Sequence, residues 1–154
     1  MIVYKHKDFG FNFTVDIKAK IPDDLVSKFY KRMSSIDKDL IEYYSSLNFD
    51  TDHSFLLLCE NEPIGYAKIY EDKNYSLLTE IYVKDEFREL SLGTFLLNSI
   101  RTYVSSINSS LRTVTLPSDR VAKNFYEASG ITARVLLMEE KRENNRYRPW
   151  RNFI

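Results

Sequence analysis

A basic residue followed by small residues marks the point where this chain could hold an anion. Arg88, Ser91 and Gly93 follow an apolar run at residues 76–83. From Leu92 onward the apolar residues recur at helical spacing, so a helix should start there. The first N–H groups of a helix have no partner within it and carry partial positive charge. A helix start beside an arginine is therefore a candidate site for a phosphate-type anion, and a plain helix cap without a ligand is the alternative.

Two better-known phosphate-binding patterns are absent from the sequence. No G-x-x-x-x-G-K-S/T run occurs, which excludes a P-loop, and glycines are too few for a dinucleotide-binding loop. His6 and His53 lie far apart and lack partners at metal-ligand spacing, so we expect no metal site. Cys59 ends an apolar run and is expected to be a packed core thiol.

The composition is that of a globular protein without a bias toward polyanions or membranes. The chain has 154 residues, 44% of them hydrophobic, with 22 basic and 22 acidic side chains. This length suits one domain over residues 1–154, and the balanced charge gives no reason to expect nucleic acid as a partner. We find no signal peptide, and no run approaches the roughly 18–20 apolar residues of a membrane span. A single cysteine suits a reducing compartment, which predicts a cytoplasmic protein.

The elements that must position the candidate residues follow from apolar periodicity and turn residues. Alternating or continuous apolar runs predict strands, and recurrence at three and four residues predicts helices. Strands are expected at residues 2–6, 11–19, 55–60, 64–70, 76–83, 111–116 and 131–138. Helices are expected to begin at Asp23, near residues 35–37, at Leu92, and after a cap at Ser118 or Asp119, with Gly130 following the last helix.

This order of elements predicts an α+β fold. The three strands between residues 55 and 83 are joined by short turns and should form an antiparallel meander. The helix from Leu92 can cross over to the strand at 111–116, which would then run parallel to 76–83. We therefore expect an α/β/α sandwich with a mixed, mostly antiparallel sheet of about six to seven strands and about four helices.

Two segments resemble the signatures of a known family. Residues 78–97 resemble the acetyl-CoA motif of the GNAT N-acetyltransferase superfamily, which is Arg/Gln-x-x-Gly-x-Gly/Ala after a strand that ends in Val. Arg88, Ser91 and Gly93 occupy its three marked positions, although glycine is usual in place of Ser91. Residues 121–130 resemble the second signature, in which an aromatic-Tyr-Glu stretch precedes Gly. The two matches occur in the family's order and at its spacing.

The resemblance implies an enzyme that moves the acetyl group of acetyl-CoA directly to a primary amine of a small molecule or protein. Acetyl-CoA would be the co-substrate, and no metal would take part. The alternative is a catalytically weak or inactive GNAT-like module that binds acyl-CoA or a partner without turnover. The sequence leaves the identity of the acceptor open.

The resemblance also implies which residues make the site. The cofactor would lie against Ile81, Tyr82, Val83, Arg88, Glu89, Leu90, Ser91, Leu92, Gly93, Thr94 and Asn124. Tyr126 matches the family's general acid, and a phenol of pKa about 10 is a reasonable proton donor to a thiolate of pKa about 8.5. The alternative is that Tyr126 belongs only to the apolar core.

Glu80 is the candidate base, or the anchor for the acceptor amine. Strand alternation would place its side chain on the same face as Leu78 and Tyr82, opposite Ile81. A carboxylate among such apolar and aromatic side chains must be solvated or paired with a donor, and a pocket can provide both water and a partner. A surface glutamate on a half-exposed strand is the alternative.

Two further regions are assigned from composition. Residues 23–53 are expected to shape the acceptor side, with contributions from Tyr43, Tyr44, Asp50 and Asp52. The acidic side chains of this region are consistent with a cationic acceptor, and the alternative is that they are solvated loop residues without a ligand. Residues 139–154 mix aromatic and basic side chains, which predicts a C-terminal extension that docks on the domain or contacts a second copy in a homodimer.

Overall fold

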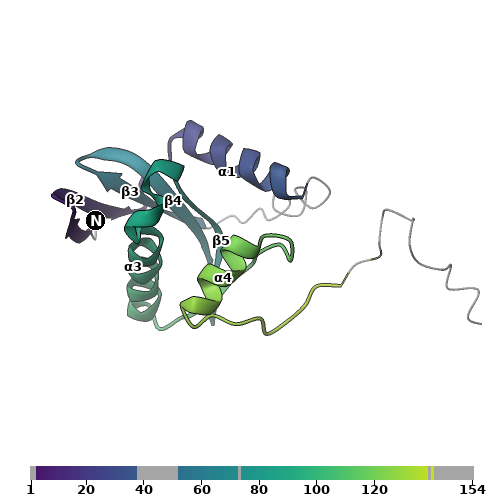
Figure 1. Cartoon of the computed structure of the whole chain (residues 1–154). Helices are drawn as coiled ribbons and strands as arrows, with labels where there is room; N and C mark the ends of the chain where they lie inside the picture. The colour runs from purple at the N-terminus through teal and green to yellow at the C-terminus, as the bar shows by residue number, and fades with distance from the viewer. Residues whose placement is uncertain (1–2, 38–51, 73, 139, 141–154) are drawn as a thin grey trace, which may run out of the picture.

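The computed structural model describes residues 3–37, 52–72, 74–138 and 140. A hairpin is followed by a helix, three strands, a helix, a strand and a last helix (Figure 1). The bounds are β1 (Val3–Asp8), β2 (Phe11–Ile17), α1 (Asp23–Ile36), β3 (Asp52–Cys59), β4 (Glu62–Glu71), β5 (Tyr75–Val83), the 3₁₀ helix η1 (Asp85–Leu90), α3 (Leu92–Ser106), β6 (Ser110–Thr113) and α4 (Arg120–Ala128).

All six described strands belong to one sheet, in the order β1-β2-β3-β4-β5-β6. Its neighbouring strands are antiparallel except for β5 and β6, which are parallel. Phe9 and Gly10 both have positive φ, 51° and 77°, as a tight hairpin turn between β1 and β2 requires. A parallel pair needs a crossover, which α3 supplies. The mixed, mostly antiparallel sheet expected from the sequence is confirmed.

Helices cover both faces of the sheet (Figure 1). On one face, Leu25, Phe29 and Met33 of α1 recur every four residues and so form one buried stripe. The sheet residues packed against that stripe include Leu56, Tyr66 and Tyr82. On the other face, a larger cluster contains Leu92, Leu96, Leu97, Ile100, Tyr103 and Val104 of α3 and Tyr126 of α4. The sheet is therefore the middle of three layers, and the expected α/β/α sandwich is confirmed.

A β-bulge in β5 changes which face its residues meet. Leu78 and Glu80 pair with consecutive residues of β4, so Thr79 is the extra residue. As a result Leu78 belongs to the cluster beneath α3, whereas Tyr82 belongs to the cluster beneath α1. The expectation that Glu80 shares a face with both residues is therefore wrong for Leu78. Alternation resumes after the bulge, and Glu80 and Tyr82 both face α1.

The strands β5 and β6 lie side by side over only part of their length. Their register pairs Tyr75 with Ser110 and ends where Leu78 pairs with Thr113. Within the described ranges, no strand pairs with this edge of β5 beyond Leu78. The expected strand at 111–116 is thus shorter than predicted, since Pro117 and the cap of α4 follow closely and lead the chain away from the sheet. The two strands part beyond this point.

The predicted seventh strand, residues 131–138, is wrong. None of these residues is in a strand, and Val135, Leu136, Leu137 and Met138 are 88, 73, 73 and 82% exposed. An apolar run becomes a strand only where a sheet edge pairs with it, and no described strand does so here.

The predicted helix starts differ in accuracy. The cap of α4 is confirmed, because the Asp119 Oδ1 accepts the Ala122 N–H at 3.1 Å. In α1, Pro22 occupies the N-cap position, so the predicted cap Asp23 lies inside the first turn, where its charge still favours the helix N-terminus.

Three α-helices are described, against about four expected. The helix predicted to begin near residues 35–37 falls largely outside the described residues, and so do Tyr43, Tyr44 and Asp50, which were assigned to the acceptor side. No helix in the described ranges is long and apolar enough to cross a membrane.

Candidate active site

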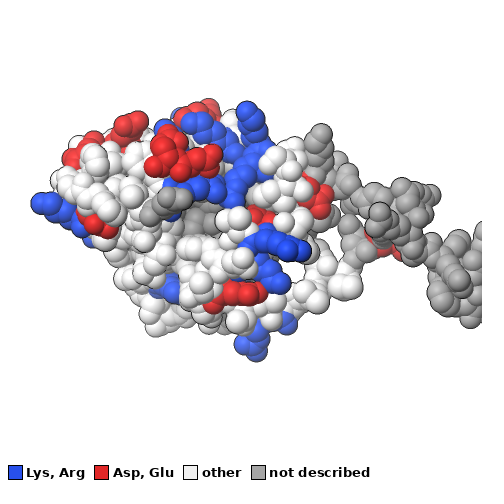
Figure 2. All heavy atoms as spheres, in the orientation of Figure 1, with Lys and Arg blue, Asp and Glu red and all other residues white. Residues whose placement is uncertain are grey.

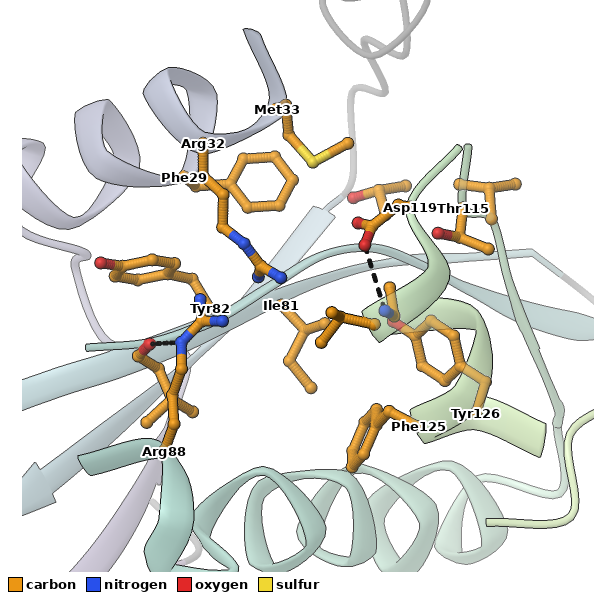
Figure 3. Close-up of a pocket in the computed structure, with 15 residues that line it drawn as sticks. Phe29, Arg32, Met33, Ile81, Tyr82, Arg88, Thr115, Asp119, Phe125 and Tyr126 are labelled. Atoms are coloured by element: carbon orange, nitrogen blue, oxygen red, sulfur yellow. Dashed lines mark hydrogen bonds between the residues drawn. The ribbon is translucent and has the colours of Figure 1, made fainter. Parts of the chain in front are cut away.

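A pocket of about 200 Å³ opens where β5 and β6 part (Figure 3). Its walls come from α1, β5, η1, α4 and the chain that joins β6 to α4. The lining residues are Phe29, Arg32, Met33, Thr79, Ile81, Tyr82, Val83, Arg88, Val114, Thr115, Asp119, Val121, Ala122, Phe125 and Tyr126.

Only part of the predicted site lines this pocket. The predicted residues that do so are Ile81, Tyr82, Val83, Arg88 and Tyr126. Those that do not are Glu80, Leu90, Ser91, Leu92, Gly93, Thr94 and Asn124, while the side chain of Glu89 lies outside what the structure describes. Residues 89–94 form the end of η1 and the first turn of α3, which follow Arg88 directly in the chain. The side chain of Leu92 is fully buried in the core and serves packing.

The open edge of β5 presents the backbone of alternate residues to the pocket. The Lys84 N–H donates to β4 at 2.9 Å, whereas the Val83 carbonyl accepts a bond at 3.2 Å from Arg88 Nε. Successive residues of a strand turn their N–H and C=O groups to opposite edges. The backbone groups of Ile81 and Val83 therefore face the open edge, and those of Tyr82 face β4. Tyr82 contributes its ring to the pocket instead.

Arg88 leans back onto the strand from η1. Its Nε donates to the Val83 carbonyl and lies 2.9 Å from Asp85 Oδ1, and its guanidinium carbon lies 5.8 Å from the centre of the Tyr82 ring. These contacts hold a positive charge at the mouth of the pocket, close to the start of α3. The position suits an anion that approaches the helix N-terminus.

Ser91 joins η1 to α3 in a left-handed conformation, with φ 59° and ψ 22°. Glycine adopts this conformation without the steric penalty of a Cβ, which gives a physical reason for glycine at this place in the signature. Gly93 is under a weaker constraint, because an added Cβ would lie 3.4 Å from the Phe125 ring, an ordinary van der Waals separation. The fold thus restricts the backbone at Ser91 more than the space at Gly93.

Ser91→Gly should stabilise the protein by up to about 1 kcal/mol. Glycine removes the steric penalty that a Cβ causes in the left-handed conformation, and this gain should exceed the entropic cost of a more flexible unfolded chain. The Ser91 side chain makes no capping hydrogen bond that would be lost. Urea unfolding measures the change. Gly93→Ala, which alters the same turn without a change of φ, is the control. A clear loss of stability in Ser91→Gly would show that the serine hydroxyl supports the turn.

Tyr126 is a buried phenol at the pocket wall. Its side chain is 5% exposed and belongs to the core cluster beneath α3. Burial raises the pKa of Tyr126 to about 12; a hydrogen bond with the Thr113 side chain opposes this rise, and the charge of Asp119 adds to it. Tyr126 is therefore a neutral hydrogen-bond donor throughout the physiological pH range.

This raised pKa predicts a loss of stability in alkali. The unfolded chain releases the Tyr126 proton near pH 10, whereas the folded chain holds it until about pH 12. The stabilisation is complete below about pH 10 and falls as the pH rises toward 12, since the folded state then binds more protons than the unfolded state. Urea unfolding over this range should show a shallower fall for Tyr126→Phe than for the wild type. Equal slopes would contradict the assignment.

Glu80 lies on the α1 side of β5, next to the pocket rather than in its wall. The side chain is 7% exposed, and its carboxylate accepts hydrogen bonds from Tyr66 at 2.7 Å and Tyr30 at 3.4 Å. Lys68 Nζ lies 3.8 Å from Oε2. Burial, and then the charge of Glu80, raise the pKa of Tyr30 to about 12. Two phenols and a lysine thus satisfy this buried carboxylate.

The sequence analysis assigned residues 23–53 to the acceptor side but did not single out the residues of α1 that line the pocket. Phe29, Arg32 and Met33 lie on a helix that carries no recognisable signature, and only the tertiary fold brings them to β5. Asp119 was identifiable only as a helix cap. Thr115 was missed as well, and its buried Oγ1 has no hydrogen-bond partner among the described residues.

These polar groups fit an extended ligand that ends in phosphate. The open backbone edge at Ile81 and Val83 can pair with an amide-containing chain as an added strand. The unpartnered Thr115 hydroxyl offers a further hydrogen bond. Figure 2 shows basic side chains gathered between α1 and the start of α3, with acidic side chains beside them. A phosphate group bound at this place could contact Arg88 and the N-terminus of α3.

The described sheet is mixed, and its two parallel strands part over a pocket next to a helix N-terminus. A family model described as "Acetyltransferase (GNAT) domain" matches residues 17–144. The chain therefore belongs to the GNAT acetyltransferase family, as the two sequence signatures predicted. No curated protein sequence matches the chain significantly.

Solved structures share the fold at low sequence identity. An aminoglycoside acetyltransferase from an uncultured soil metagenomic sample is 16% identical with a TM-score of 0.58, over 84% of this chain and 97% of that chain. A GNAT family acetyltransferase from Elizabethkingia anophelis with acetyl-CoA bound is 20% identical with a TM-score of 0.54, over 83% and 73%. The aminoglycoside 6′-N-acetyltransferase of Acinetobacter baumannii is 14% identical with a TM-score of 0.52, over 82% and 98%.

Proposed function

We propose that this protein transfers the acetyl group of acetyl-CoA to the amine of a second substrate. The observation that carries the proposal is that the open edge of β5 and the phenol of Tyr126 line one pocket. An amide-containing thioester could pair with that edge and meet a hydrogen-bond donor at its reactive end. The similarity to a structure with acetyl-CoA bound supports this choice of cofactor.

The cofactor would lie from the start of α3 toward the centre of β5. Its diphosphate would meet Arg88 and the backbone of Glu89, Leu90, Ser91, Leu92, Gly93 and Thr94. Its pantetheine amides would pair with Ile81 and Val83, beside the ring of Tyr82. Asn124 would contact the same arm from α4. Pairing with Val83 requires Arg88 to release the carbonyl it now holds.

Acetyl transfer joins the amine nitrogen to the thioester carbonyl carbon and breaks the C–S bond. The Val83 N–H faces the open edge and can stabilise charge that develops on the carbonyl oxygen. Tyr126 can donate its hydrogen bond to the departing sulfur. Because its pKa is about 12, the phenol remains mostly protonated while it stabilises the thiolate, and the proton that the amine loses finally neutralises the sulfur.

Glu80 is assigned to the amine side of the reaction. It is a buried carboxylate on the face of β5 that α1 covers. Its negative charge would favour the approach of an ammonium group, and its remaining lone pairs could accept the proton that the nitrogen releases, directly or through water.

Binding of acetyl-CoA is the first test of this proposal. Acetyl-CoA should raise Tm, since a ligand at 100 times its Kd adds roughly 2.7 kcal/mol to the stability of the folded state. Thiol release in the presence of a panel of primary amines should then report transfer. No shift of Tm at millimolar acetyl-CoA would refute the assigned cofactor. A shift without thiol release from any amine would instead make the protein an acyl-CoA-binding module.

A further inference from the structure

Arg32 brings a positive charge to the pocket from the side opposite α3. It lies on α1, and Figure 3 shows its guanidinium pointing into the pocket toward that of Arg88. The side chain is half-buried and forms no ion pair with any described carboxylate. A partly desolvated charge without a partner is unfavourable in the empty protein, which suggests that a ligand supplies the opposite charge.

The neighbours of Arg32 supply that opposite charge only in part. Burial lowers the pKa of Arg32, and the like charge of Arg88 lowers it further, whereas Asp119, Asp85 and Tyr82 act in the opposite direction. Both carboxylates have other partners: Asp85 lies 2.9 Å from Arg88, and Asp119 caps α4 at 3.1 Å. An anion bound by Arg32 would offset the repulsion between the two guanidinium groups.

The position of Arg32 favours the acceptor rather than the cofactor as the source of this anion. The proposed cofactor site runs from the start of α3 along the edge of β5, whereas Arg32 reaches the same pocket from the wall that α1 forms. Beneath α1 lies Glu80, whose carboxylate Tyr30 of the same helix contacts. One helix thus borders both a carboxylate suited to an amine and a guanidinium suited to an oxyanion.

We infer that the acceptor is an amine that also carries an oxyanion, either a carboxylate or a phosphate, and that Arg32 binds this group. The inference rests on the proposed function and specifies its substrate class. A planar guanidinium binds either oxyanion through two parallel hydrogen bonds. An aminoglycoside carries several ammonium groups and no oxyanion, so the arginines in this pocket oppose it.

The test uses acceptors that differ only in the oxyanion. We would compare α-, β- and γ-amino acids with the amines left after removal of the carboxylate, and phosphoethanolamine with ethanolamine. Kanamycin serves as a polycationic acceptor. The wild type should prefer the oxyanion member of a pair. Arg32→Gln should reduce kcat/KM for that member roughly 10–100-fold more than for its partner, mainly through KM, and Arg32→Lys should recover part of the loss. The acceptor pair that shows the preference identifies the bound oxyanion as a carboxylate or as a phosphate.

A second measurement does not depend on turnover. The Arg32 Nε–Hε NMR signal of the CoA complex should move on addition of N-acetylated amino acids or N-acetylphosphoethanolamine, and not with N-acetylpropylamine. Equal losses for both members of a pair, a preference for kanamycin, or an unmoved signal would overturn the inference. A fall in acetyl-CoA affinity in Arg32→Gln, measured by calorimetry, would assign Arg32 to the cofactor. If the wild type binds no acetyl-CoA, the proposed function itself fails, whereas transfer without an oxyanion preference refutes only the inference.

Discussion

Tyr126→Phe should lower kcat by about a hundredfold, because the departing thiolate loses its hydrogen-bond donor in a buried site. The substitution keeps the ring and its contacts in the core, so the structure should be preserved. The affinity for acetyl-CoA should change little, since the hydroxyl acts on charge that appears only during the reaction. Thiol release at saturating acetyl-CoA measures kcat, and calorimetry measures binding.

Tyr103→Phe is the matched control. Tyr103 is also a buried tyrosine of the cluster beneath α3, but its hydroxyl donates to Glu71 and it does not line the pocket. It should lose stability and retain turnover. If both variants retain turnover, Tyr126 has only a packing role. If Tyr126→Phe loses acetyl-CoA affinity in parallel with kcat, the hydroxyl binds the cofactor in the ground state.

Glu80→Ala should destabilise the fold by about 3 kcal/mol, as expected when one partner of a buried charged network is removed. The Tyr66 ring is fully buried, and its hydroxyl would lose the acceptor that it now contacts at 2.7 Å. Lys68 would lose its nearby carboxylate. Urea unfolding at neutral pH measures the change.

Glu80→Gln separates the structural role of this side chain from its charge. The amide oxygen can still accept the Tyr66 hydrogen bond, so most of the stability should remain while kcat/KM falls. Tyr66→Phe, alone and combined with Glu80→Ala, closes a double-mutant cycle whose coupling should be about 1–3 kcal/mol. Full activity in Glu80→Gln would make Glu80 a structural residue, and the amine would then need another partner.

Local sequence patterns were sufficient for most of the fold. The meander and the crossover helix depend on strand periodicity and on the switch to helical spacing at Leu92, and both are present in the structure. The bulge at Thr79 was beyond such reasoning, because a single extra residue leaves the apolar pattern of β5 nearly unchanged while it reverses which face Leu78 meets. The strand expected at 131–138 failed for a related reason, since pairing depends on a partner edge and not on local composition.

The candidate site was predictable to the extent that it follows the two signatures. Arg88, Val83 and Tyr126, to which the family resemblance gives roles in cofactor binding or catalysis, line one pocket. Arg32 could not be found in this way, because its relation to Arg88 arises only when α1 packs across the sheet. Neither signature includes α1, so the signatures carry no information about this wall of the pocket.

The contact between Arg88 Nε and the Val83 carbonyl affects how inhibitors of this site should be designed. That carbonyl already has a donor at 3.2 Å, so a compound that binds it exchanges one hydrogen bond for another. The net gain from such a group is small, and adding donors aimed at Val83 should scarcely improve potency. A compound that leaves this bond intact and instead fills the apolar wall formed by Phe29, Met33 and Phe125 would gain affinity without displacing the arginine.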